Sequence, residues 1–421
     1  MRESDSWIDD AAWPRVHFRA IVVLAAALRL GIAALTLAVH SPEWFFSNAA
    51  DLSYLAQSIA SAHGLSSPFG GSTGPSALIT PGYPGLIAAI FAIFGSKSAA
   101  SAIAVIGAQI LFAVLTVLVI MQIANRLFGA MTANIAGTLW AVSPPLLWMP
   151  MLFWDTCLSA LLLIGALAFS LLLAERRGTN LWLLAGVTCG LTLLVNPALI
   201  LAMIAMFGWA AFRARSVSSH KPMMGLLVMF MVFMPWPIRN VHVMHAPILL
   251  RSSFGYELWQ GNRPGGKGAF DETLYPLHSR SEYAQYVSLG EVGYMREKSA
   301  KAEAYIRAHP YEFVCLTARR ITRYWVGTQE NENLLIVELY TVPTLVLGSL
   351  GLVLFLRGRN PAAAIFLLPI LLYPLPYYIT DVRFRYRMII DPFMTILAAY
   401  AITQMTAFFR KRSRPVVAAE I

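Results

Sequence analysis

The sequence predicts an all-α polytopic membrane protein, and three observations lead to this fold class. Of the 421 residues, 57% are hydrophobic and only 13% are charged, whereas a soluble domain carries about 25% charged residues. Several apolar runs reach the roughly 20 residues that a helix needs to cross a bilayer. The net charge of +10 comes from basic residues gathered at the ends of these runs, where they orient spans, so it does not indicate nucleic-acid binding.

About ten transmembrane helices are expected. Their predicted ranges are 17–39, 98–123, 131–150, 155–174, 180–195, 197–212, 222–238, 334–356, 361–379 and 387–408. The apolar segment 84–95 is too short to cross and is expected to lie in the outer leaflet. With that choice the basic clusters at 15–19, 126, 176–177, 213–221, 357–359 and 410–414 fall on one side, as the positive-inside rule favours. Both termini are then cytoplasmic.

Three parts follow from this map. Residues 1–238 form a transmembrane module that includes a first outer loop (40–97), residues 239–330 form a mainly helical periplasmic region, and residues 331–421 form the last transmembrane helices and a basic tail. Within the periplasmic region, 295–308 is expected to be a polar helix that stops at His309-Pro310. The amphipathic stretch 311–325 is expected to place Phe313, Leu316 and Trp325 in the membrane interface.

The first outer loop holds one carboxylate, Asp51, near the start of a short helical pattern. Leu52, Leu55 and Ile59 recur three or four residues apart, which is typical of an amphipathic helix lying on a membrane surface. Thr80-Pro81-Gly82-Tyr83-Pro84 predicts a stiff turn that leads into a new helix. The pattern therefore favours a site for a substrate half in lipid, with Asp51 as its acid. The alternative is that Asp51 only stabilises the first helical turn.

Arginines at the outer ends of predicted spans are the second group of candidates. They are Arg239, Arg251, Arg383, Arg385 and Arg387. The planar guanidinium pairs with phosphate oxygens and stays charged, so a lipid phosphate at the outer surface is the expected partner. The alternative for each is simple anchoring to headgroups.

The remaining candidates carry weaker signals. Asp155 is either a second acid of the site or the N-cap of the next span, and the cap is favoured. Tyr54 and Tyr83 accompany Asp51 and the proline turn as candidate substrate contacts. The three cysteines have neither metal-ligand nor disulfide-framework spacing. No metal ligand set is evident and no cofactor is assigned, although a divalent metal stays an open option. The chain has no P-loop and no HExxH, which are the usual signatures of ATP-driven transport and zinc proteolysis.

Several short motifs resemble one superfamily. They are ADLSYLAQSIASAHGL followed by TPGYP, PWPIRN with RSSFGYELWQGN, YIRAHPYEF, and RFRYRMIIDP. Together they resemble the GT-C superfamily of integral-membrane glycosyltransferases, which includes dolichyl-phosphate-mannose protein mannosyltransferases and lipid A aminoarabinose transferases. The resemblance implies polyprenyl-phosphate sugar donors and a catalytic base at Asp51. It departs from the lipid A enzymes at Thr80, where they have a lysine.

These expectations combine into one predicted function. The chain is expected to be an inverting glycosyltransferase of the bacterial inner membrane, with its site on the periplasmic face. It would move a sugar from a polyprenyl phosphate to a glycan, lipid or protein acceptor, and it would bind no nucleic acid. The alternatives are a transporter or flippase for lipid-linked sugars, which would bind without chemistry, and a non-catalytic assembly factor.

Overall fold

The computed structural model describes residues 17–175, 178–214, 220–327 and 334–412. These residues are mainly helical and form no strand, only an isolated bridge between Ser66 and Pro75. The N-terminal helices are α1 (Phe18–Val39), α2 (Pro42–Ser47), α3 (Ala50–Ala60), α4 (Gly82–Phe94), α5 (Ala99–Phe128), α6 (Ala130–Val142), α7 (Pro144–Trp148), η1 (Met149–Met151) and α8 (Thr156–Glu175). They are followed by α9 (Thr179–Val195), η2 (Pro197–Leu199), α10 (Ile200–Arg213), α11 (His220–Phe233) and α12 (Pro235–Met244). The outer region holds α13 (Phe254–Gly261), η3 (Glu272–Leu274), α14 (Arg280–Ala308) and α15 (Pro310–Val326), and the chain ends with α16 (Leu334–Arg357), α17 (Ala363–Leu372), α18 (Leu375–Ile379) and α19 (Phe384–Arg412).

The apolar helices make this a multi-pass membrane protein. Among the described residues, six helical stretches are long and apolar enough to cross a bilayer: α1, α5, α8, His220–Met244, Val337–Arg357 and Phe384–Arg410. Four shorter apolar stretches accompany them: α4, α9, Pro197–Arg213 and Ala363–Ile379. The predicted fold class is thus confirmed, while the number of about ten crossings stays a prediction. Of the basic clusters, Arg15, Arg176, Arg177, Arg215 and Arg414 lie outside the described residues.

Proline interrupts the helices at two points, once inside a predicted span and once between two predicted spans. The span expected at 131–150 divides at Ser143-Pro144 into α6 and α7, because proline has no N–H to donate and restricts the residue before it. The expected break at Asn196-Pro197 is confirmed, and the Asn196 side chain accepts the Ala198 N–H at 3.1 Å. Irregular backbone at these two points lines the cavities described below.

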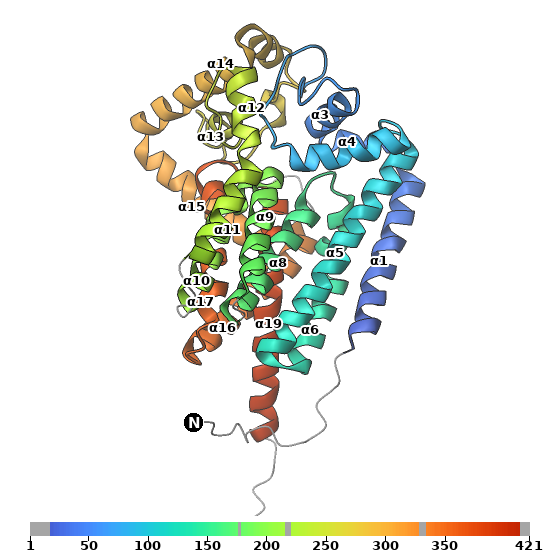
Figure 1. Ribbon diagram of the computed structural model, residues 1–421, viewed down its shortest axis with the longest axis vertical. Coiled ribbons are helices and arrows are strands. Elements are labelled where there is room, and N and C mark those ends of the chain that lie inside the picture. Colours follow the sequence, from blue (N-terminus) through green and yellow to red (C-terminus); the bar gives the residue numbers. More distant parts are fainter. Residues whose placement is uncertain (1–16, 176–177, 215–219, 328–333, 413–421) are drawn as a thin grey trace, which may run out of the picture.

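The outer ends of the helices carry the first outer loop and the region after α12. Figure 1 shows α3, α4, α13 and α14 gathered at one end, opposite the start of α1 and the end of α19. In the same view α4 lies across the bundle rather than along α1 and α5, and whether it crosses the membrane stays a prediction. Gly82 permits the proline turn to touch α9, since a Cβ there would lie 2.7 Å from the Leu194 carbonyl oxygen.

A buried carboxylate joins the first outer loop to the outer region. Glu291 follows Gly290, whose φ of 65° kinks α14. Its carboxylate accepts the Ala77 N–H and the Ser252 hydroxyl at 2.7 Å, and the Tyr286 hydroxyl at 2.8 Å. These three bonds hold the segment before the proline turn against α14.

Helix α15 is amphipathic as predicted, but the expectation that Leu316 enters the membrane interface was wrong. Leu316 is buried, and the Trp325 indole N–H donates to the Tyr378 hydroxyl at 2.7 Å. Arg320 is fully buried and donates to the carbonyl oxygens of Gly261 and Tyr378, each at 2.7 Å. This face packs on the protein because Arg320 finds backbone acceptors there that a lipid surface would not supply.

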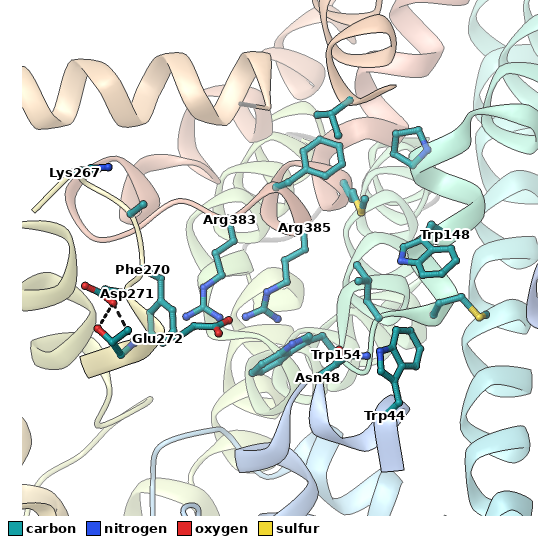
Figure 2. A pocket seen from close by; sticks show the side chains of 18 of the residues that line it. Trp44, Asn48, Trp148, Trp154, Lys267, Phe270, Asp271, Glu272, Arg383 and Arg385 are labelled. Atoms are coloured by element: carbon teal, nitrogen blue, oxygen red, sulfur yellow. Dashed lines mark hydrogen bonds between the residues drawn. The ribbon is translucent and has the colours of Figure 1, made fainter. Parts of the chain in front are cut away.

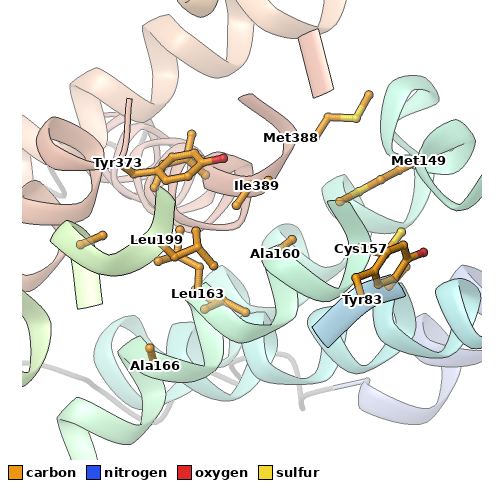
Figure 3. Close-up of a cluster of buried hydrophobic side chains, with 14 of the residues drawn as sticks. Tyr83, Met149, Cys157, Ala160, Leu163, Ala166, Leu199, Tyr373, Met388 and Ile389 are labelled. Carbon is orange, nitrogen blue, oxygen red and sulfur yellow. The ribbon is translucent and has the colours of Figure 1, made fainter. Parts of the chain in front are cut away.

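The core of the bundle is made by α5, α6, α8, α10 and α19. Figure 3 shows Leu163, Leu199 and Tyr373 converging within it, and each is fully buried. Ala160 and Ala166 lie on α8 in the same cluster, where small side chains let membrane helices approach closely. The core therefore fixes the position of α8 relative to α10 and α19, the helices whose outer ends carry the site.

Candidate functional site

A cavity of about 1170 Å³ opens at the end of the bundle that carries α3, α4, α13 and α14. We call it the large cavity. Its walls come from the first outer loop, the 144–154 segment, the 263–273 loop and the start of α19. Figure 2 shows Arg383 and Arg385 pointing into it side by side, with Trp154 and Phe270 beside them. Trp44 and Trp148 also line it, so a ligand would meet both cations and aromatic rings, together with the carboxylates of Asp271 and Glu272.

A second cavity of about 330 Å³, the small cavity, adjoins the large one. Its lining is mostly apolar, from the proline turn, the α9–α10 break and the start of α19, and it also holds Asp155, Arg251 and Glu257. Trp154 and Arg385 line both cavities. The two spaces therefore meet at this pair of side chains.

Arg385 stands out among the arginines at the junction. Its guanidinium carbon lies 3.7 Å from the Trp154 ring centroid and 4.9 Å from that of Tyr386. Its Nη2 is 3.4 Å from the Tyr386 hydroxyl, and its buried Nε has no hydrogen-bond partner among the described residues. No carboxylate of the described chain forms an ion pair with Arg385. The charge is thus held by aromatic faces and keeps donors available for an anion.

The other three arginines that line the cavities are paired with carboxylates. Arg263 Nη2 lies 2.6 Å from Asp271 Oδ2 in the large cavity. Arg383 Nε lies 3.2 Å from Asp381 Oδ2, and its guanidinium covers Phe270 at 3.8 Å. Burial raises the pKa of Asp381, although Arg383 opposes this shift. Arg251 Nη2 lies 3.5 Å from Glu257 Oε1. Burial disfavours the charge on Arg251, but Glu257 and other neighbours outweigh it and raise its pKa.

The remaining predicted arginines point elsewhere. Arg239 donates to the carbonyl oxygens of Ser76 and Leu65, each at 2.8 Å, and lines a separate hollow of about 710 Å³ that also contains Tyr54. Arg387 is fully buried and pairs with Asp391 at 3.2 Å. The structure therefore does not bring Arg239, Arg387 or Tyr54 to the two joined cavities.

Asp51 lines neither of the two cavities. Its Oδ2 accepts the Tyr275 hydroxyl at 2.7 Å, and its Oδ1 accepts the Leu52 N–H at 2.9 Å. The side chain is 7% exposed. Asn48 lines the large cavity and Leu52 the small one. Burial and the Asp51 carboxylate raise the pKa of Tyr275 well above its usual range, so this hydroxyl stays a donor.

The small cavity contains the other two predicted residues. Asp155 directly precedes α8, and its Oδ2 accepts the Ser159 hydroxyl at 2.6 Å, while Asn196 Nδ2 donates to the same hydroxyl at 3.0 Å. Tyr83 is buried, and its hydroxyl has no partner among the described residues. Asp155 thus begins a helix and faces the cavity at once, so both of its predicted roles remain open.

Several side chains of the site were missed from sequence. Glu257 lies inside a motif that was singled out, Asp381 is two residues before Arg383, and Trp154 is next to Asp155, so proximity was the available signal. Tyr275 has no such signal, because only the fold brings it to Asp51. Among the described residues no three His, Cys, Asp or Glu side chains converge as a metal ligand set, and no step below is routed through a metal.

The fold is similar to that of solved membrane-bound oligosaccharyltransferases. The archaeal oligosaccharyltransferase AglB from Archaeoglobus fulgidus, solved with an inhibitory peptide and a dolichol-phosphate, matches with a TM-score of 0.53 and 15% identity, covering 96% of this chain and 52% of that one. Its apo form matches equally, with a TM-score of 0.53, 16% identity, and 94% and 52% covered. This chain therefore spans about half the length of that oligosaccharyltransferase.

The family model for dolichyl-phosphate-mannose-protein mannosyltransferase matches residues 79–238. ArnT from Cupriavidus metallidurans, bound to undecaprenyl phosphate, is similar with a TM-score of 0.40 and 12% identity, covering 92% of this chain and 79% of that one. No curated protein sequence matches the chain. The resemblance to the GT-C superfamily that the sequence motifs predict is thus confirmed.

Proposed function

We propose that this protein is an inverting glycosyltransferase that takes a sugar from a polyprenyl phosphate. The observation that carries the proposal is Arg385, a guanidinium without a carboxylate partner in the described chain, placed where the two cavities meet. An anion at this point would accept its free donors and gain strength from the water-poor surroundings. That the related oligosaccharyltransferase was solved with a dolichol-phosphate supports a lipid phosphate as the anion.

The two cavities have the characters that such a reaction needs. The small cavity is mostly apolar and suits the first units of a polyprenyl chain, while the large one, with its polar rim, suits the acceptor. The phosphate would lie at Arg385, with Arg383 and Arg251 on either side. As the bond between the anomeric carbon and the phosphate oxygen breaks, negative charge grows on the phosphate, and fixed cations stabilise it there.

Asp51 is the proposed general base. It would take the proton of an acceptor hydroxyl while that oxygen attacks the anomeric carbon and the lipid phosphate departs. The carboxylate is already held by the Leu52 N–H, so the acceptor hydroxyl would replace the Tyr275 hydroxyl on Oδ2. Between turnovers the Tyr275 hydroxyl would return to Oδ2 and keep the Asp51 carboxylate oriented.

The binding part of this proposal can be tested without knowing the sugar. Undecaprenyl phosphate binding to the purified protein in nanodiscs can be measured by native mass spectrometry. Arg385→Ala is expected to weaken it at least tenfold, because a charge-assisted pair contributes about 1.5–3 kcal/mol. Arg126→Ala is the matched control, since Arg126 pairs with Glu175 away from both cavities. Equal binding by both variants would remove Arg385 from the site.

We propose the periplasmic side of a bacterial inner membrane as the location of the site. The basic ends of the described spans support this side, and lipid-linked sugars reach such a site from the outer leaflet. A transporter of lipid-linked sugars would bind the same phosphate but form no glycosidic bond. Transfer of labelled sugar to an acceptor by the purified protein therefore separates the two functions.

A further inference from the structure

An apolar crevice lies where the second half of α15 meets the transmembrane bundle. Its volume is about 400 Å³, and none of the described charged side chains lines it. Ile321 and Trp325 of α15 face Leu345 and Leu352 of α16, with Met394 of α19 beside them. A hollow of this composition binds hydrocarbon rather than water or a polar ligand.

The crevice continues onto an apolar face of α15. Tyr311 is 82% exposed and Val314 is 62% exposed, and Cys315 and Ala318 are exposed on the same side. These positions recur at helical spacing, opposite the buried Leu316. No part of the described chain covers this face, and Arg319 is exposed at its edge.

The exposed side chains of α16 indicate which kind of molecule covers the apolar face of α15. On this membrane-spanning helix the exposed large apolar side chains among the described residues are Leu339, Val342, Val346, Leu350, Val353 and Leu356. Such residues face lipid in a polytopic protein. Figure 1 shows α15 descending from the outer region to the bundle, and its last turn is joined to α16, since the Thr341 hydroxyl donates to the Val326 carbonyl oxygen. The apolar face of α15, the crevice and the lipid-facing side of α16 are thus neighbours.

We propose that a phospholipid of the outer leaflet occupies this surface. One acyl chain of this lipid fills the crevice, neighbouring acyl chains cover Val314 and Ile321, and the lipid phosphate lies beside Arg319. The lipid contact reaches the large cavity through α15 itself. Arg320 donates to the Gly261 carbonyl oxygen and Arg323 to that of Lys267, at 2.7 and 2.9 Å, so α15 holds the 261–267 segment that leads into the cavity rim.

The native cysteines make this proposal directly testable. Cys315 is exposed, whereas Cys157 and Cys189 are buried, so a nitrobenzoxadiazole maleimide should label Cys315 selectively. A second probe is placed at Ser349, which lines the crevice, by Ser349→Cys in a Cys315→Ser background. The control is Ser288→Cys in that background, on the exposed turn before the α14 kink. Each protein is reconstituted in phosphatidylcholine–phosphatidylglycerol nanodiscs with or without doxyl-labelled phospholipid.

The expected result is strong quenching of the probes at 315 and 349 by doxyl lipid and weak quenching by aqueous iodide, with the reverse at 288. Iodide quenching at 315 and 349 equal to that at 288 would show that the face lies in water and would overturn the proposal. Energy transfer between separately labelled copies, with no doxyl quenching, would show instead that a second copy covers the face. Because neither readout requires activity, these outcomes stand apart from the fate of the proposed glycosyl transfer.

Discussion

Arg385 and Trp154 form a stacked pair, with the guanidinium carbon 3.7 Å from the ring centroid, and both side chains line both cavities. The stack fixes the plane of the guanidinium without neutralising it, because an aromatic face attracts the charge but is not an anion. The neighbouring Arg383 and Arg251 each have a carboxylate within 3.5 Å. The three arginines are therefore not equivalent, and substitutions should separate them.

Arg385→Lys should lower the rate of sugar transfer about 10- to 100-fold, the equivalent of one lost charge-assisted hydrogen bond. Lysine keeps the charge but loses the planar fork and the stacking on Trp154. The measurement is initial transfer rate with lipid-linked sugars extracted from native membranes. Arg239→Lys is the comparison: it should lower thermal stability, since Arg239 bridges two backbone carbonyls, and leave binding of undecaprenyl phosphate unchanged. Unchanged transfer by Arg385→Lys would contradict a bidentate role.

Asp51→Asn should give a folded protein that binds undecaprenyl phosphate but turns over roughly 10²–10⁴-fold more slowly, as loss of a general base predicts. A purely structural carboxylate would behave differently, because losing a helix-end interaction costs about 0.5–2 kcal/mol of stability and need not affect chemistry. Tyr275→Phe provides the internal control. It removes the hydrogen bond to Oδ2 and keeps the carboxylate, so its effect on rate should be much smaller. Near-normal transfer by Asp51→Asn would end the base assignment.

Four tyrosines of the outer region should resist ionisation at alkaline pH. Burial raises the pKa of Tyr256, Tyr275, Tyr286 and Tyr294, and the Asp51 charge adds to the rise at Tyr275. In the unfolded chain they ionise near pH 10. Their contribution to stability is therefore complete below about pH 10 and is lost as the pH rises above it, because only the unfolded state ionises there.

The measurement is absorbance at 295 nm against pH, compared with circular dichroism of the same samples. Ionisation of these four groups should coincide with loss of helical signal. Tyr275→Phe should remove one group from that late phase. Titration of all 16 tyrosines near pH 10 in a protein that remains helical would contradict the prediction.

Glu291→Ala should loosen the segment before the proline turn. The substitution leaves the Ala77 N–H and the hydroxyls of Ser252 and Tyr286 without their acceptor, and each unsatisfied buried donor costs about 1–3 kcal/mol. Hydrogen exchange of peptides covering 76–80 should accelerate, and the melting temperature should fall. Glu303→Ala, on the exposed side of α14, is the matched control and should change neither. Unchanged hydrogen-exchange protection of residues 76–80 in Glu291→Ala would show that the hydrogen bonds of Glu291 are not needed to hold this segment.

The predicted topology calls for a labelling experiment in intact spheroplasts. Cysteines at Ser72 and Gly265, introduced into a Cys315→Ser background, should react with an impermeant thiol reagent. One at Ser413, which lies outside the described residues, should not. The background substitution is needed because Cys315 is itself exposed. Reaction at Ser413 alone would place the proposed site on the opposite side of the membrane.

The parts of the fold set by local composition could be predicted. Apolar runs identified the helices around 18–39, 99–128 and 384–412, and the Asn196-Pro197 break was visible because proline acts on its immediate neighbours. The face of α15 could not be predicted from periodicity, since both of its sides carry apolar residues. What decided its orientation was Arg320, which bonds carbonyls near 261 and 378 that only the folded chain brings together.

Some residues of the candidate site could be predicted from sequence, but their contacts with remote residues could not. Short motifs drew attention to Arg383, Arg385, Arg251 and Asp155, which do line the joined cavities. They could not show that Arg239 bonds backbone carbonyls 163 and 174 residues away in sequence. Nor could they show that Tyr275 meets Asp51, a contact between residues 224 positions apart. Partners this remote leave no pattern within a single segment.

The side chains common to both cavities imply that their occupants cannot bind independently. A ligand that draws Arg385 towards the small cavity withdraws its donors from the large one, and departure of that ligand returns them. Thermodynamic linkage then requires each occupant to alter the affinity of the other by the same factor. Under the proposed function, the affinities for spent lipid phosphate and for incoming acceptor would thus be coupled through one guanidinium.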